Sequence, residues 1–227
     1  MGTLSREKID RYKANGLRAY NQKWPERYDS SAFIRFWIRR YDQTVVSAIE
    51  DLDRSYRILD VGCATGRLLG TLASAGFDNL AGVDIAERIV SVSKRHLEQI
   101  GVSADLSVAD AEAGLPWHSS SFDIVTLTGV FHHFFRPEMA IQEISRVLSP
   151  GGKVVVVDPW FPPIVRHVIN IALRVKPHNG DYRFYSPREI TVLFNRYGLD
   201  TEWWRRAAIH SFVVVVRRPM SPSSSST

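Results

Sequence analysis

The chain has 227 residues, which allows one domain with a good-sized core, or a domain and a small cap. Hydrophobic residues make up 44% and charged residues 23%, as in ordinary globular proteins, so global disorder is excluded. The single cysteine, Cys63, excludes an intramolecular disulfide framework, an all-cysteine zinc site and any chemistry that needs two thiols. The net charge of +5 comes without a dense basic run, which favours a solvated basic surface over a nucleic-acid site.

The first residues are polar, and no stretch of about 18 apolar residues exists, so the sequence predicts neither a signal peptide nor a transmembrane helix. We therefore expect a cytoplasmic protein. Residues 1–55 are rich in aromatic side chains and are expected to form an N-terminal helical cap. Within it, Ser30 or Ser31 caps a predicted helix that ends near Leu52.

From Tyr56 onward, apolar runs alternate with amphipathic segments. Helices are predicted from residue 67 and over 87–100 and 137–148, with a turn at 149–152. The apolar runs predict strands over residues 57–61, 80–84, 104–109, 122–127 and 153–157. This alternation indicates a parallel sheet covered on both faces.

Regular alternation ends after Asp158. Residues 161–186 are expected to form an inserted lid segment, whose amphipathic part, 164–175, could contact a membrane surface, cover an apolar substrate or simply pack. Ser186 and Glu189 have the form of a capping box, which predicts a helix to about residue 197. Strands at 199–205 and 210–217 close the main domain, 56–218. The low-complexity tail, 219–227, is expected to be disordered.

The most informative motif runs from Ile58 to Gly66. It predicts a strand, a glycine-bearing turn and a helix N-terminus, whose free N–H groups suit an oxygen-rich ligand. Asp84 ends the next strand, at the position where an acidic side chain binds ribose hydroxyls. The dinucleotide pattern G-x-G-x-x-G is broken at Ala64 and Arg67, which argues against a nicotinamide or flavin cofactor.

Residues 60–66 resemble motif I of the class I S-adenosylmethionine-dependent methyltransferases, of the small-molecule type found in ubiquinone and menaquinone biosynthesis. Four further segments resemble this family in the same order: 84–85, 109–123, 128–133 and 146–152. The resemblance covers about residues 56–217, and its departure is Ala64, where many members have glycine. It implies a Rossmann-like, doubly wound sheet of seven strands, the last antiparallel, with the helical cap and an insertion after strand five.

The resemblance also implies S-adenosyl-L-methionine as the cofactor. In it, Asp60 orients the methionine amino group, Asp84 binds the ribose hydroxyls and Asp110 accepts from the adenine amino group. The other cofactor-binding residues that it implies are Gly62, Cys63, Gly66, Ile85, Ala111 and Thr128. N-terminal helices often cover the pocket in this family, which makes candidates of Tyr12, Tyr20 and Trp24.

His132 and His133 are the catalytic candidates, because they are expected to end strand four beside the expected methyl group and imidazole titrates near neutral pH. We expect no metal there, since adjacent histidines should point apart and no carboxylate is close in sequence. Cys63 is interpreted as a packing residue. Four residues after the lid helix could reach the pocket: His178, Asp181, Tyr182 and Tyr185.

The sequence therefore predicts methyl transfer to a small, apolar or aromatic molecule by in-line attack on the sulfonium methyl. An RNA or protein methyltransferase remains an alternative, although residues 128–131 lack the Asn/Asp-Pro-Pro-Tyr pattern of enzymes that methylate exocyclic amines, and no RNA-binding module is recognisable. A nicotinamide-dependent oxidoreductase and a non-catalytic, cofactor-binding partner subunit are the rivals from other classes. The oligomeric state stays open.

Overall fold

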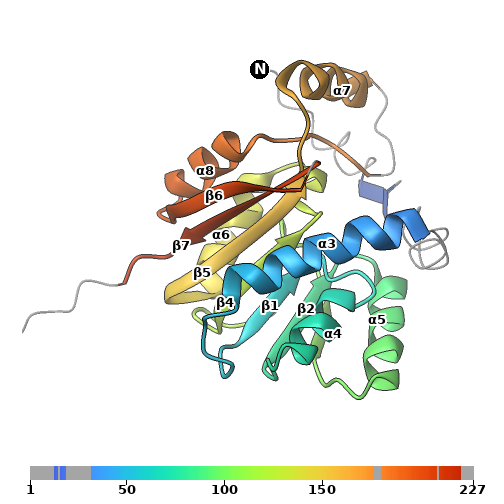
Figure 1. Ribbon diagram of the computed structural model, residues 1–227, viewed down its shortest axis with the longest axis vertical. Coiled ribbons are helices and arrows are strands. Elements are labelled where there is room, and N and C mark those ends of the chain that lie inside the picture. Colours follow the sequence, from blue (N-terminus) through green and yellow to red (C-terminus); the bar gives the residue numbers. More distant parts are fainter. Residues whose placement is uncertain (1–12, 15, 19–31, 176–179, 209, 221–227) are drawn as a thin grey trace, which may run out of the picture.

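The computed structural model describes residues 13–14, 16–18, 32–175, 180–208 and 210–220 (Figure 1). Its centre is a seven-stranded sheet with the order β3-β2-β1-β4-β5-β7-β6. Strands β1 to β5 pair in parallel, and β7 is antiparallel to both β5 and β6. The predicted doubly wound fold is confirmed, including the antiparallel last strand.

The strands lie within a few residues of their predicted positions. They are β1 (Ile58–Val61), β2 (Leu80–Asp84), β3 (Asp105–Val108), β4 (Phe122–Thr128), β5 (Leu148–Pro159), β6 (Asp200–Ala208) and β7 (Ser211–Arg217). The central strands are apolar and buried along their length, because helices cover both faces of the sheet.

Two helical layers enclose the sheet (Figure 1). On one face lie α3 (Ala32–Ile49), α4 (Arg67–Ser74) and α5 (Glu87–Gln99), which contribute Val45, Leu69 and Leu97 to one apolar core. On the other face lie α6 (Pro137–Val147) and α8 (Pro187–Arg196), which contribute Ile141 and Phe194 to a second core. Strand residues alternate between the two cores, as the period of a strand requires.

Helix α8 begins at the predicted capping box. The Ser186 hydroxyl accepts from the Glu189 N–H, and the Glu189 carboxylate accepts in turn from the Ser186 N–H. The remaining helix, α7 (Pro163–Val175), follows β5 as predicted and lies beyond the end of the sheet in Figure 1.

One boundary was predicted wrongly. The turn at 149–152 and the strand from 153 form a single element, since β5 already pairs with β4 at Leu148. Phe122 pairs with Leu148 while Ile124 pairs with Lys153, so the glycine-rich stretch bulges within the ladder. Gly151 adopts a φ of 78°, and its N–H donates to the carbonyl of Arg218, which explains how a turn-like sequence stays in the sheet.

Several predictions fall on residues outside the described ranges. These are the cap at Ser30 or Ser31, the aromatic residues Tyr12, Tyr20 and Trp24, the loop residue His178 and the tail beyond residue 220.

Candidate cofactor and acceptor site

A cavity lies at the carboxyl ends of β1, β2 and β4. Because β1 pairs with β2 on one side and β4 on the other, the chain connections diverge here, which is where open α/β sheets bind ligands. Eight of the nine predicted cofactor-binding residues line it: Asp60, Gly62, Cys63, Asp84, Ile85, Asp110, Ala111 and Thr128. The structure thus brings together side chains that lie up to 68 positions apart in sequence (128 − 60).

Gly66 is the exception, since it does not line the cavity. It is the N-cap of α4 in a left-handed conformation with φ 76°, and a Cβ there would collide with the Ser93 hydroxyl of α5. Gly62 is also left-handed, and a Cβ on it would lie 2.5 Å from Val130 Cγ2. Both glycines are therefore required by the path of the loop rather than by chemistry.

Ala64, the departure from the family pattern, adopts a φ of 46°. This is the left-handed region that glycine occupies without cost, so alanine keeps the path of the loop at the expense of some strain. The Ala64 N–H donates to Asp84 Oδ2 at 3.2 Å, which ties the loop to the end of β2.

Asp60 is buried at the end of β1, where its Oδ1 accepts from the Thr126 hydroxyl at 2.7 Å. Burial raises the pKa of Asp60 to about 7, the Thr126 hydrogen bond opposes this shift, and the nearby Asp84 adds to it. A carboxylate in this position gains from a cationic ligand group, so Asp60 suits the ammonium of a methionine moiety.

Asp84 is held in place by two backbone donors. Its Oδ1 accepts from the Ala86 N–H at 2.9 Å, and its Oδ2 accepts from the Ala64 N–H. Asp84 lines the cavity, and a carboxylate oxygen can accept more than one hydrogen bond, so Asp84 suits two ribose hydroxyls. Ile85 lies beside it, 37% exposed, where an apolar side chain can cover an adenine ring.

The adenine end contains an ion pair that the sequence did not reveal. Lys13 Nζ lies 2.6 Å from Asp110 Oδ2 and also contacts the buried Glu112 carboxylate. Lys13, Gly16 and Leu17 also line the cavity, so this part of the N-terminal region contributes to its wall. Asp110 Oδ1 accepts from the Glu112 N–H at 3.0 Å.

One further observation supports the fit of this cavity to S-adenosylmethionine. The Thr128 hydroxyl is buried and has no hydrogen-bond partner among the described residues, although it lines the cavity. Buried polar atoms in folded proteins are nearly always paired, so this atom fits a bound polar group. Cys63 is buried, and burial raises the pKa of its thiol well above the ordinary value, in agreement with a packing role.

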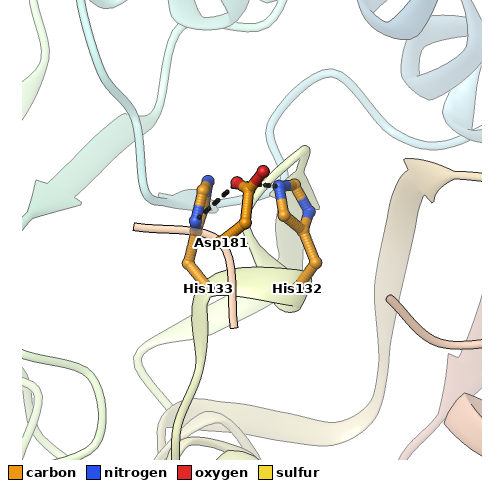
Figure 2. Close-up of side chains that lie close together, drawn as sticks. All are labelled: His132, His133 and Asp181. Carbon is orange, nitrogen blue, oxygen red and sulfur yellow. Dashed lines mark ion pairs between the residues drawn. The ribbon is translucent and has the colours of Figure 1, made fainter. Parts of the chain in front are cut away.

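His132 and His133 do not end β4 but form a short 3-10 helix, Phe131–His133, after it. The expectation that their rings point apart is wrong. The two ring centroids lie 4.0 Å apart, and both rings face the carboxylate of Asp181 (Figure 2). A 3-10 turn has about three residues per turn, so neighbouring side chains converge more than they would on a strand.

Asp181 contacts both rings at similar distances. Its Oδ1 lies 3.5 Å from His132 Nε2 and 3.4 Å from His133 Nδ1. On the far side of His132, Nδ1 lies 2.9 Å from Oδ1 of the fully buried Asp158, at the end of β5. His133 lines the cavity, whereas His132 does not.

The two histidines differ in electrostatic environment. Burial alone would lower the pKa of His132, but the carboxylates of Asp158 and Asp181 outweigh it and raise the pKa to about 10. Burial and the neighbouring His132 lower the pKa of His133 to about 3. The carboxylates therefore favour the protonated form of His132, whereas burial and the neighbouring His132 favour the neutral form of His133.

The loop after α7 reaches the site only in part. Tyr182 does not line the cavity but packs on Phe135, which does, with ring centroids 4.6 Å apart. Tyr185 is buried in the core against Phe131 and does not line the cavity. Sequence reasoning missed Lys13, Glu112 and Asp158. Of these three, only Asp158 carried a signal in the sequence, because it is a carboxylate at the end of the apolar run of β5.

Helix α7 exposes an apolar face. Ile164, Val168 and Ile171 are 79%, 59% and 48% exposed, whereas Leu173 is buried. Within the ranges that the structure describes, none of the helices has the length and apolar character needed to cross a membrane.

Comparison with known proteins identifies the family of this fold. A family model described as a methyltransferase domain matches residues 59–156. The ubiquinone biosynthesis O-methyltransferase of Ralstonia nicotianae is 33% identical over 191 residues, which cover 73% of this chain and 78% of the relative. The demethylmenaquinone methyltransferase of Thermus thermophilus is 36% identical over 120 residues, covering 52% of this chain and 53% of the relative.

A solved S-adenosylmethionine-dependent methyltransferase from Aquifex aeolicus superposes with a TM-score of 0.63 and 18% identity, covering 78% of this chain and 89% of that one. The fold and the cavity at the carboxyl ends of its strands define a Rossmann-like α/β protein. The chain belongs to the class I S-adenosylmethionine-dependent methyltransferases. It spans 42 to 65% of the length of three further ubiquinone biosynthesis O-methyltransferases that it matches.

Proposed function

We propose that the protein transfers a methyl group from S-adenosylmethionine to a hydroxyl oxygen of a small, apolar or aromatic molecule of the quinol type. The observation that carries this proposal is the continuity of one cavity, which runs from the ribose-binding acid Asp84 to His133 and the aromatic side chains of Phe134 and Phe135. The names of the relatives from Ralstonia and Thermus, which act in quinone biosynthesis, support this acceptor class.

In this proposal the chain's own residues mainly position and enclose the reactants. Asp60, Asp84 and Asp110 fix the cofactor at its ammonium, ribose and adenine groups. When bound, S-adenosylmethionine supplies a methyl group on a positively charged sulfur, which an oxygen nucleophile attacks in line. Much of the rate enhancement in such a reaction comes from holding the acceptor oxygen in line with the bond between methyl carbon and sulfur, and from excluding water.

The acceptor end is assigned to the side of the cavity opposite the adenine pocket. Phe134 and Phe135 supply apolar surface there, and Gly180 permits close approach from the loop after α7. His133 is the histidine that an acceptor hydroxyl can contact, and His132, which does not line the cavity, is proposed as a positioning residue behind it. This assignment refines the prediction that either histidine acts on the substrate.

The test is methyl transfer from labelled S-adenosylmethionine to a panel of acceptors: an isoprenoid catechol, a demethylmenaquinol, a bulk RNA and a bulk protein. Label in the isoprenoid catechol, with a product mass and fragmentation typical of a methyl ether, supports the proposal. Label confined to RNA or protein would replace it with a macromolecular methyltransferase. Binding of the cofactor without transfer to any acceptor would favour the non-catalytic subunit.

A carbon-methylating activity is the second candidate, because the Thermus relative is named a demethylmenaquinone methyltransferase. In this candidate the acceptor is a quinol-type ring, and the new bond forms to a ring carbon. The same assay separates the two candidates, since an O-methyl product loses its label on ether cleavage and a C-methyl product keeps it.

We further propose that the apolar face of α7 makes peripheral contact with a membrane, from which a long-chain acceptor enters. Its exposed side chains, Ile164 and Val168, would be buried in the interface. The double variant Ile164→Asp, Val168→Asp should abolish sedimentation with phosphatidylglycerol vesicles and leave transfer to a short-chain, water-soluble acceptor unchanged. Equal sedimentation of both proteins would overturn this contact.

A further inference from the structure

We propose that His132, His133 and Asp181 form a binding site for one divalent transition-metal ion of the zinc type. One ligand atom from each residue lies within 4.8 Å of the other two. The role of this ion rests on the proposed function, but its binding does not. Two imidazoles and one carboxylate are a common ligand set for ions that keep open coordination positions for catalysis.

The distances favour metal ligation over direct hydrogen bonding. Asp181 Oδ1 lies 3.5 Å from His132 Nε2 and 3.4 Å from His133 Nδ1. An N–H···O hydrogen bond is shorter, with a mode of about 2.9 Å. Ligands on a tetrahedral ion with bonds of about 2.1 Å lie about 3.4 Å apart, which is the spacing of Asp181 Oδ1 from each of the two histidine nitrogens.

A second carboxylate orients the first ligand. Asp158 Oδ1 lies 2.9 Å from His132 Nδ1. In the neutral imidazole that a metal ion requires, a proton on Nδ1 can donate to Asp158, and the lone pair of Nε2 is left for the ion. Histidines that bind metals usually donate their second nitrogen to a carboxylate in this way. Asp158 is fully buried, and its other oxygen, Oδ2, has no hydrogen-bond partner among the described residues.

The cluster is also held rigidly. The N–H groups of Tyr182 and Arg183 both donate to the His132 carbonyl at 3.0 Å, which fixes the loop that carries Asp181 against the 3-10 helix. The ring of Phe184 stacks on that of His132, with centroids 4.9 Å apart. Asn170 of α7 in turn bonds the backbone N–H and carbonyl of Phe184. The ligands are therefore placed before an ion binds, as a functional site requires.

The local charge matches a divalent cation. Asp158 and Asp181 supply two negative charges next to two imidazoles, in a region where His132 and Asp158 are buried. Taking two carboxylates out of water is costly unless positive charge compensates them. One divalent ion balances both charges without a proton on either imidazole.

The open side of the site faces the acceptor. His133 and the neighbouring Gly180 line the cavity, so an ion between His133 and Asp181 has access to a bound substrate. An acceptor hydroxyl that binds the ion loses its proton to water more readily, because the ion stabilises the oxyanion. That oxygen then forms the bond to the methyl carbon, while the carbon–sulfur bond breaks and its electron pair stays on sulfur.

The experiment is a calorimetric titration of the tag-free, chelator-treated protein with Zn²⁺, and a parallel titration with Co²⁺ followed by visible absorption. One ion per chain, with the Co²⁺ spectrum of a four- or five-coordinate site, is expected. Asp181→Asn and His133→Gln should each weaken Zn²⁺ binding by about 100-fold, and Asp158→Asn by about 10-fold. The matched control is His118→Gln, which removes an exposed histidine and should leave binding unchanged.

Circular dichroism of each variant guards against loss of the fold. The proposed metal site is overturned if the parent protein binds no ion. It is also overturned if Asp181→Asn is folded and binds Zn²⁺ as tightly as the parent does. Methyl transfer separates this result from the proposed function. If the chelator-treated protein, with no ion bound, still transfers the methyl group, the proposed function stands and the ion has no role in it. If the ion binds tightly to the three residues but no acceptor is methylated, the metal site stands and the proposed function is wrong.

Discussion

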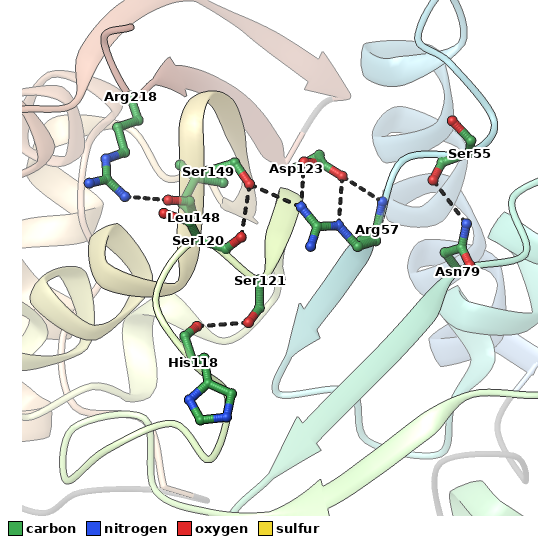
Figure 3. Close-up of polar contacts among 10 residues, drawn as sticks. All are labelled: Ser55, Arg57, Asn79, His118, Ser120, Ser121, Asp123, Leu148, Ser149 and Arg218. Atoms are coloured by element: carbon green, nitrogen blue, oxygen red, sulfur yellow. Dashed lines mark hydrogen bonds and ion pairs between the residues drawn. The ribbon is translucent and has the colours of Figure 1, made fainter. Parts of the chain in front are cut away.

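The two ends of the central sheet use polar residues in opposite ways. At the amino ends of β1 and β4, charged and hydroxyl side chains are paired with one another or with the backbone (Figure 3). At the carboxyl ends, carboxylates are buried with raised pKa values, and the Thr128 hydroxyl lacks a partner among the described residues. The difference indicates that one end serves the stability of the fold and the other is arranged for a ligand that completes it.

The amino end is a closed network. The Arg57 guanidinium binds both oxygens of Asp123, at 3.0 and 3.1 Å, and one of its nitrogens also donates to the Ser149 hydroxyl. Burial would raise the pKa of Asp123, but the bonds from Arg57 outweigh burial and hold it below its usual range. These bonds join the first residues of β4 and β5 to the start of β1, so they fix the register of three strands.

The largest expected effect comes from removing one carboxylate at each end of the sheet and comparing the two losses of cofactor affinity. Asp84→Ala should weaken S-adenosylmethionine binding by about 100-fold, because two hydrogen bonds from ribose hydroxyls to a charged acceptor are lost. The matched variant Asp123→Ala removes a carboxylate from the amino end and should leave this affinity unchanged. Calorimetric titration measures both, and an equal loss in the two variants would contradict a functional division of the sheet.

The next effect concerns the cap over the adenine end. Lys13→Ala leaves Glu112, whose side chain is 1% exposed, without its cation, and should lower the free energy of unfolding by about 2 kcal/mol. Lys153→Ala breaks the more exposed pair with Glu202 and should cost less than about 1 kcal/mol. Urea unfolding provides the measurement. Equal losses in the two variants would mean that Lys13 does not hold the cap in place.

Sequence alone predicted the sheet, and eight of the nine residues that it assigned to the cofactor line one cavity, because both depend on local patterns. Apolar runs, the turn from Asp60 to Gly66 and the acid at Asp84 are each readable within a few residues. The acceptor end was not readable, since Asp158 and Asp181 approach His132 only through the tertiary fold. Lys13 was missed for the same reason, because its partner Asp110 lies 97 positions away.

A pH titration tests the buried charge at the carboxyl end. The pKa of Asp60 is raised from 3.8 to about 7. In the free protein this group therefore lowers the free energy of unfolding as the pH rises from about 4 to about 7, because the unfolded chain loses the proton more readily than the folded protein. A bound ammonium group needs the ionised form. Cofactor affinity should therefore fall up to about tenfold for each pH unit below 7, the most that one proton taken up on release allows. Calorimetry between about pH 5 and pH 8 measures this slope.

Asp60→Asn is the control, since an amide cannot titrate. It should bind the cofactor weakly and with little dependence on pH over the same range. A slope that persists in Asp60→Asn would assign the proton to another group at the cavity.

The smallest effect compares two residues with the same strain at opposite ends of the sheet. Ala64, at the carboxyl end, and Ser120, at the amino end, both adopt positive φ values, 46° and 58°. Replacing either by glycine relieves about 1 kcal/mol of left-handed strain, partly offset by the greater entropy of glycine in the unfolded chain. We expect each variant to be more stable by about 0.5 kcal/mol in urea unfolding.

Their effects on the cofactor should differ. The Ala64 N–H donates to Asp84, so a more flexible loop in Ala64→Gly should reduce S-adenosylmethionine affinity by about twofold. Ser120, just before β4, accepts from the Ser149 hydroxyl through its carbonyl and donates its N–H to the Arg146 carbonyl, both far from the cavity, so Ser120→Gly should leave the affinity unchanged. If Ala64→Gly gains stability at no loss of affinity, the strain at Ala64 has no part in binding, and the contrast between the two ends rests on the buried acids alone.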